Sequence, residues 1–75
     1  MFITIQYKDA KNVFRGRTYD YELCADEELL QCGDIIRMAD EDWNYICYGT
    51  RVKVVDVKTE SATAAQKIHY VKTTM

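Results

Sequence analysis

Short runs of alternating apolar and polar residues, separated by polar turns, are the feature that most constrains the fold of this chain. Residues 2–8 (FITIQYK) place two isoleucines and a tyrosine on one face, as expected for a strand with one buried side. Similar runs, rich in Tyr, Val and Ile, follow at residues 13–23, 34–38, 43–49, 51–58 and 67–73. Frequent short strands predict a small all-β barrel, whose closure removes the edges that a chain without proline cannot otherwise protect.

Two irregularities in these runs predict bulges or bends. Gly16 lies inside the second run between two arginines, where glycine is typical of a bulge or tight bend. In RVKVVDVK the first two valines share one face and the last two share the other, so the strand has a bulge or is buried on both sides. The runs at 43–49 and 51–58 are either two strands or one long strand bent at Gly49.

The alternation stops at residues 24–33 (CADEELLQCG), between the second and third runs. The segment ADEELL is too short for an independent helix, so we expect one helical turn with its acidic residues at the positive N-terminal end. One of its two leucines is expected to cover an end of the barrel, and Gly33 to end the turn with a positive φ. The segment is interpreted as a barrel corner.

The length of 75 residues predicts a single domain, residues 1–75, with a modest core. The longest apolar stretches are a few residues long, which excludes a transmembrane helix and the apolar segment of a signal peptide. Met1, followed directly by a strand, suggests a native start. We therefore expect a complete cytoplasmic protein that does not contact a membrane.

Chemistry that would identify an enzyme or a metal site is missing from the sequence. Cys24, Cys32 and Cys47 form no CxxC pair, and His69 is the only histidine, whereas structural zinc usually takes four ligands in close pairs. Three reduced, partly buried thiols are expected, with a Cys24–Cys32 disulfide as the alternative. No phosphate-binding glycine loop or nucleophile motif is present, so the prediction is a non-enzymatic protein without cofactor or metal.

The order of the motifs resembles a group of small proteins from bacteriophages and prophages, which are similar to small SH3-like barrels. That group typically has a Tyr-x-Tyr strand, Leu-x-x-Gly-Asp before an apolar strand, a Val-rich strand and an Ala-x-Lys-Ile-like close. The resemblance covers about residues 2–72, and its matching positions are Tyr19, Tyr21, Leu30, Gly33, Asp34, Val52, Val54, Val55, Val57, Ala65, Lys67 and Ile68. Isoleucines stand where the group usually has valines after Gly-Asp.

The resemblance implies a phage accessory protein located in the cytoplasm of the bacterial host, and it brings no catalytic or ligand-binding residues. Together with the strand pattern it predicts an SH3-like β-barrel of five to six short antiparallel strands with one short helical turn. Tyr19 and Tyr21 share a face and are expected in the core, whereas His69 is expected at the surface.

Charge is distributed unevenly along the chain, which suggests where a partner would bind. Residues 19–42 carry nine acidic residues against one arginine, while both ends of the chain are basic. The leading hypothesis is a module that binds a host or phage protein through this acidic surface, with a tryptophan as anchor. The expected contacts are Asp40, Glu41, Asp42 and Trp43, with Asp26, Glu27 and Glu28 as a second patch.

Two other kinds of partner stay open. Small barrels bind single-stranded nucleic acid by stacking bases on exposed aromatic rings beside a basic groove. The residues suited to that role are Phe14, Arg15, Arg17, Arg51 and Lys53. An isoelectric point near 5.2 and the acidic middle segment argue against it. Self-association through unprotected strand edges is the other possibility.

Overall fold

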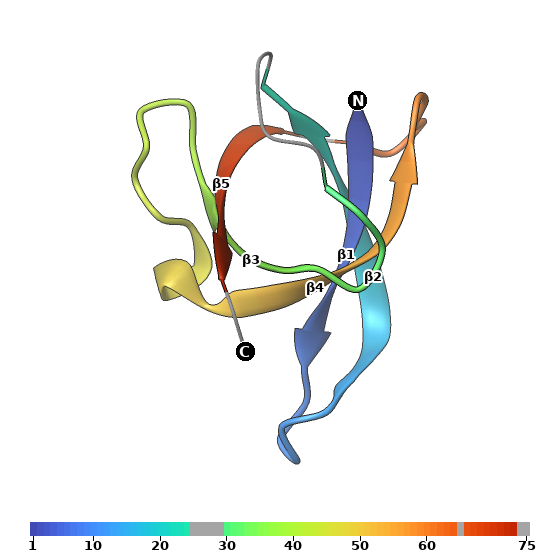
Figure 1. Cartoon of the computed structure of the whole chain (residues 1–75), viewed down its shortest axis with the longest axis vertical. Helices are drawn as coiled ribbons and strands as arrows, with labels where there is room; N and C mark the ends of the chain where they lie inside the picture. Colours follow the sequence, from blue (N-terminus) through green and yellow to red (C-terminus); the bar gives the residue numbers. More distant parts are fainter. Residues whose placement is uncertain (25–29, 65, 74–75) are drawn as a thin grey trace.

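The chain forms a single small β-barrel in a computed structural model that describes residues 1–24, 30–64 and 66–73. Five strands close in the order β1-β2-β5-β3-β4, arranged around one ring (Figure 1). They are β1 (Phe2–Lys8), β2 (Phe14–Leu23), β3 (Ile35–Ala39), β4 (Arg51–Lys58) and β5 (Lys67–Thr73), with one short turn, η1 (Cys47–Gly49). The predicted all-β barrel is confirmed, and five of the predicted runs are strands.

One strand pairing differs from the expected antiparallel pattern. Four pairings are antiparallel, but β2 and β5 are parallel and are joined at Glu22–Lys67 and Leu23–Ile68. The connection after β4 leads the chain back to the end of β2, so that β5 starts beside that end and runs in the same direction. Parallel neighbours cannot be joined by a tight turn, and here the chain between β2 and β5 includes β3 and β4.

The irregular positions in the sequence are irregular in the barrel. Between β1 and β4 the register shifts after Thr4, so that Thr4 faces Asp56, Ile5 faces Val54, and Val55 is the extra residue. This bulge lets valines from both faces of β4 serve the core, as predicted. Gly16 has a φ of 91° within the part of β2 where its register with β1 also shifts.

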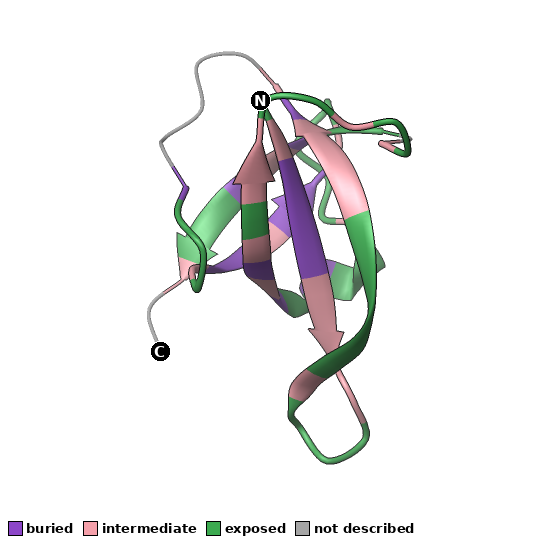
Figure 2. Cartoon of the chain, turned by 90° about the vertical axis from the view of Figure 1, so that its right-hand side faces the viewer, coloured by how far each residue is buried: buried purple, intermediate pink, exposed green. Residues whose placement is uncertain are grey.

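The core lies inside the ring and is built mostly from aliphatic side chains. Its buried members are Ile3, Ile5, Leu23, Leu30, Ile36, Met38, Val52, Val54, Ile68 and Tyr70. The buried part of β1 lies within the barrel, whereas the hairpin formed by β1 and β2 extends well beyond it (Figure 2). Tyr21 packs against the core, but Tyr19 is 40% exposed, so the prediction that it belongs to the core is wrong.

The predicted strand over residues 43–49 does not form. Tyr45 makes an isolated bridge with Ala39, and the rest of the segment is a loop followed by η1. The reason is local, because Trp43, Cys47 and Tyr48 all have positive φ, which an extended strand does not allow. The alternation in WNYICYG therefore belongs to a compact loop and not to a strand.

The corner at residues 24–33 can be compared with its prediction only in part, because residues 25–29 lie outside the described residues. Leu30 is buried in the core, as expected for one of the two leucines, and Gly33 has the predicted positive φ, 96°. No disulfide joins Cys24 and Cys32; Cys24 is half-buried, whereas Cys32 and Cys47 are exposed rather than partly buried. None of the helical turns in the described residues is long and apolar enough to cross a membrane.

Candidate binding surface

The loop that follows β3 is organised by a single carboxylate. Asp40 Oδ1 accepts hydrogen bonds from the backbone N–H groups of Asp42 and Asn44, both at 2.9 Å. The backbone N–H of Asp40 donates to Asn44 O, and that of Trp43 donates to Asp40 O. Asp40 thus closes its own loop, as aspartate commonly does in turns, and its role is structural. Glu41 and Asp42 are left exposed at the tip.

Trp43 occupies the position in this loop that a bulky side chain tolerates least. Its φ is 64°, in the left-handed region that favours glycine and asparagine. Its ring stacks on the imidazole of His69 in β5, with centroids 4.1 Å apart and planes 12° apart, yet 54% of the residue stays exposed. His69, predicted at the surface, is half-buried, and it orients the tryptophan ring without covering it.

Tyr45 and Arg37 form a second fixed pair beside Trp43. The Arg37 guanidinium lies over the Tyr45 ring, 4.1 Å from its centroid, and Nε–H donates to Gly49 O at 2.9 Å. Gly49 suits this contact, because a Cβ on it would lie 2.7 Å from Arg37 Nη2 and displace the guanidinium, and its φ is 68°. Tyr45 remains 46% exposed, so both partners are held in place at the surface.

The turn η1 is left-handed throughout. Cys47, Tyr48 and Gly49 have φ values of 51°, 56° and 68°, and a left-handed residue other than glycine costs about 1–2 kcal/mol. Tyr48 is fully exposed at this turn. Cys47 Sγ lies 3.0 Å from the hydroxyl of Tyr7, and burial, followed by this hydrogen bond, raises the pKa of Tyr7. Backbone strain of this kind is concentrated at functional sites in proteins.

These features define one surface, which we call the aromatic surface. It consists of Trp43, Tyr45 and Tyr48, which are all exposed, together with His69 and Arg37, which contact the rings of Trp43 and Tyr45. Tryptophan, tyrosine and arginine are the residues that most often dominate the energetics of protein interfaces. Sequence analysis found Trp43 but missed Arg37, because its contacts with Tyr45 and Gly49 depend on a loop that was predicted to be a strand.

The predicted acidic contacts are only partly available. Asp40, Glu41, Asp42 and Trp43 do lie together in one loop, but the Asp40 carboxylate is occupied by backbone N–H groups. Asp26, Glu27 and Glu28, the predicted second patch, lie outside the described residues. The acidic contribution that the structure supports is therefore that of Glu41 and Asp42, next to the tryptophan.

The residues proposed for nucleic acid do not form one site. Arg15 is ion-paired with Asp9, and the guanidinium of Arg17 lies 5.8 Å from the Tyr19 ring. The Phe14 ring is 5.2 Å from the Lys8 ammonium. The remaining two, Arg51 and Lys53, lie two positions apart on the outer face of β4, because Val52 and Val54 face inward.

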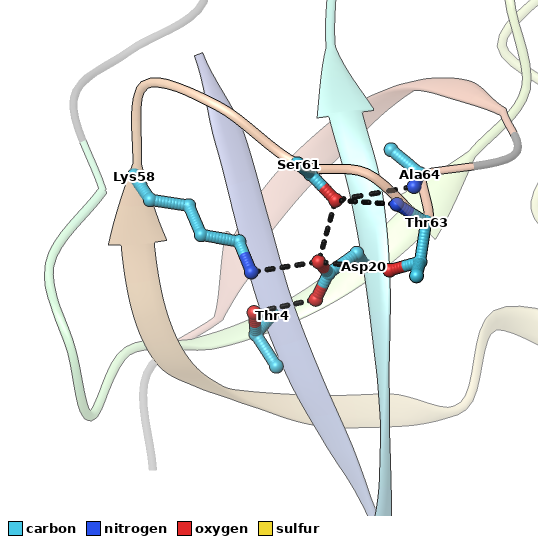
Figure 3. Close-up of polar contacts among 6 residues, drawn as sticks. All are labelled: Thr4, Asp20, Lys58, Ser61, Thr63 and Ala64. Carbon is cyan, nitrogen blue, oxygen red and sulfur yellow. Dashed lines mark hydrogen bonds and ion pairs between the residues drawn. The ribbon is translucent and has the colours of Figure 1, made fainter.

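A second polar cluster surrounds Asp20 near the opposite end of β1 (Figure 3). Its carboxylate accepts hydrogen bonds from the hydroxyls of Thr4, Ser61 and Thr63 and pairs with Lys58 at 2.7 Å. The Lys58 ammonium, followed by these hydroxyls, holds the pKa of Asp20 well below its usual value. A carboxylate with four partners is suited to tying β1, β2 and β4 to the following loop, so we assign this cluster to stability.

Comparisons with protein-family models, with curated proteins and with solved structures gave no match to this chain. The resemblance to small phage proteins therefore stays a prediction based on the sequence motifs alone.

Proposed function

We propose that this protein is a non-enzymatic protein-binding module and that the aromatic surface is its contact site. The observation that carries the proposal is Trp43, which is kept half-exposed and stacked on His69 at a backbone position that disfavours it. A large ring that is already ordered loses little conformational entropy on binding, which is the property of an interface anchor.

Glu41 and Asp42 add negative charge to the proposed contact surface. They are exposed at the tip of the same loop as Trp43, so a partner with a basic surface around an apolar pocket fits this end of the molecule best. Such a surface would be a basic face of a host or phage protein, and the sequence resemblance supports that source. The same resemblance is the basis for proposing an SH3-like barrel of phage or prophage origin. Asp26, Glu27 and Glu28 remain proposed as a second acidic patch.

The direct test is partner capture with Trp43→Asn, because asparagine accepts the left-handed conformation and preserves the loop. We expect the wild-type chain to retain a defined protein from host lysate, and Trp43→Asn to bind it at least about tenfold more weakly. Val13→Ser, which removes an exposed apolar side chain from the other hairpin loop, is the matched control and should bind normally. Equal capture by wild type and Trp43→Asn would refute the proposal.

The acidic part is tested separately with Glu41→Gln combined with Asp42→Asn. Rim charges act mainly on the association rate, so this variant should associate more slowly and with a weaker dependence on salt, while dissociation changes little. Asp40 is left intact in this experiment, because its replacement would disturb the loop itself.

A further inference from the structure

A basic cleft lies next to the aromatic surface, between the end of β1 and the start of β4. It has a volume of about 390 Å³ and is lined by Lys8, Arg37, Gly49, Thr50 and Arg51. Within the described ranges, none of its three cations is ion-paired with a carboxylate. A cleft with three cations and no acidic lining residue attracts an anion, even in a protein whose net charge is −2.

Arg37 is fixed within this cleft before any ligand arrives. Its Nε–H is used by Gly49 O and its plane lies over Tyr45, whereas its terminal nitrogens have no protein acceptor in the described part of the chain. Because Gly49 has no Cβ, the guanidinium packs directly against the backbone of the turn. An ordered guanidinium with unused N–H groups is the arrangement that recognises phosphate oxygens with two parallel hydrogen bonds.

An exposed aromatic residue is the chain neighbour of one residue that lines the cleft. Tyr48 immediately precedes Gly49, one of the lining residues, and the left-handed turn holds it fully exposed. On the other side of Arg51, Lys53 continues the positive charge along the outer face of β4. Small barrels bind single strands by stacking a base on an aromatic ring while cations contact the phosphate backbone. A phosphate site near an exposed tyrosine and a basic strand fits this mode of binding.

We propose that this cleft binds single-stranded nucleic acid, with one phosphate between Lys8, Arg37 and Arg51 and the neighbouring base stacked on Tyr48. Of the residues predicted for this function, Arg51 and Lys53 take part, whereas Phe14, Arg15 and Arg17 do not enter the cleft. The site shares Arg37 and Tyr48 with the aromatic surface but does not include Trp43, so nucleic-acid binding is an activity that does not depend on Trp43. With one phosphate contact, binding is weak and its salt dependence is modest.

The test is fluorescence anisotropy with a labelled single strand of about ten nucleotides, as DNA and as RNA, from about 25 mM to about 150 mM salt. One phosphate held by the three cations predicts a slope of log K against log salt of about −0.7 for a single strand. Arg51→Ala should weaken binding and make that slope shallower. Arg37 is not the test residue, because its loss would also disturb Tyr45 and Gly49.

Lys67→Ala is the control for charge alone. It removes one positive charge from the exposed start of β5, outside the cleft, and should leave both affinity and slope nearly unchanged. Tyr48→Asn keeps a residue that tolerates positive φ but removes the ring. It should weaken binding about fivefold or more while leaving the salt slope unchanged, because stacking does not release counterions.

Three results would overturn the proposal. One is the absence of binding at the lowest salt, where attraction between charges is strongest. Another is an equal loss for Arg51→Ala and Lys67→Ala, which would indicate diffuse attraction rather than this cleft. The third is that inorganic phosphate competes for the site while Tyr48→Asn has no effect. That result would indicate a site for phosphate anions in which no base is stacked. Trp43→Asn should not change this binding, which separates it from the proposed protein contact.

Discussion

Two loops of this barrel have the same backbone hydrogen bonds but carry very different residues at their fourth position. The loop of residues 9–13 joins β1 to β2, and the loop of residues 40–44 follows β3; they project from different sides of the barrel (Figure 1). In each, the first aspartate accepts hydrogen bonds through Oδ1 from the third and fifth N–H groups, at 2.8–3.0 Å. In each, the backbone also pairs the first residue with the fifth and the fourth with the first.

The fourth position is left-handed in both loops, with φ 65° at Asn12 and 64° at Trp43. Asparagine is among the few residues that adopt this conformation readily, and the first loop uses it. The second loop forms the same turn with a tryptophan. The aspartate and the backbone hydrogen bonds form the same turn in both loops, so the turn does not need a tryptophan. The exposed ring of Trp43 is therefore better explained by a function than by the fold.

The largest effect is expected at Asp20, which shows what a carboxylate contributes when it joins separate segments rather than closing its own loop. Asp20→Ala leaves Thr4 and Lys58 without their acceptor, and should lower the free energy of unfolding by about 2–3 kcal/mol in urea titration at neutral pH. Lys58→Met removes only the ion pair and should cost at most about 1 kcal/mol. Equal losses would mean that the hydroxyl contacts contribute nothing.

The same cluster predicts a pH dependence. The pKa of Asp20 is lowered in the folded chain, so its contribution is complete above the unfolded pKa of about 3.9 and is lost as pH falls from there through the folded value. Asp9 behaves in the same direction, because the backbone N–H of Val13 lowers its pKa. Asp20→Asn should therefore flatten stability below about pH 4, measured by urea titration across the acid range.

Placing a tryptophan in the first loop tests whether the fourth position carries a backbone cost. Asn12→Trp places a bulky residue in the left-handed position of the first loop, where no imidazole is stacked against it. It should lower the free energy of unfolding by about 1–2 kcal/mol, whereas Asn12→Gly should leave it nearly unchanged. A tryptophan that is accepted at position 12 without loss would remove the argument that Trp43 is kept against a backbone cost.

Asp40→Ala tests whether the first aspartate forms the loop. Two backbone N–H groups lose their acceptor at an exposed site, so we expect a loss of about 1 kcal/mol in urea titration. Asp40→Asn, which keeps an acceptor oxygen, should lose little. If Asp40→Ala left both stability and the Trp43–His69 stacking unchanged, the loop would be held by its backbone hydrogen bonds alone.

Local patterns in the sequence predicted the parts of the fold that depend on neighbouring residues. The shift in RVKVVDVK predicted a bulge or burial on both sides, and the structure has the bulge at Val55. His69, predicted at the surface, is half-buried on the face of β5 opposite the buried Ile68 and Tyr70. The parallel pairing of β2 with β5 joins residues that are far apart in the chain, so no local sequence pattern predicts it. The same limit applies to the basic cleft, which brings Lys8 to Arg37 and Arg51 only through barrel closure.

The segment 43–49 shows why most of the aromatic surface was not predicted from the sequence. Its alternating aromatic residues are typical of a strand, and turns with positive φ are usually recognised by glycine or asparagine at the critical position. Here Trp43, Cys47 and Tyr48 take those positions, so the usual signal is absent. The polar segments 9–12 (DAKN) and 39–42 (ADED) have the composition of turns, but only the structure shows that the two loops share one geometry.

The smallest expected effect on stability is also the most informative. Trp43→Asn removes a backbone cost of about 1–2 kcal/mol and loses a ring contact worth about 0.5–1.5 kcal/mol, so the free energy of unfolding should change by less than about 1 kcal/mol. Trp43→Ala loses the ring but keeps much of the cost, and should be less stable than Trp43→Asn. The two variants should be equally poor at capturing the partner. That combination would separate the ring's role in binding from its role in the fold, whereas a Trp43→Asn chain that unfolds would show that the tryptophan holds the loop together after all.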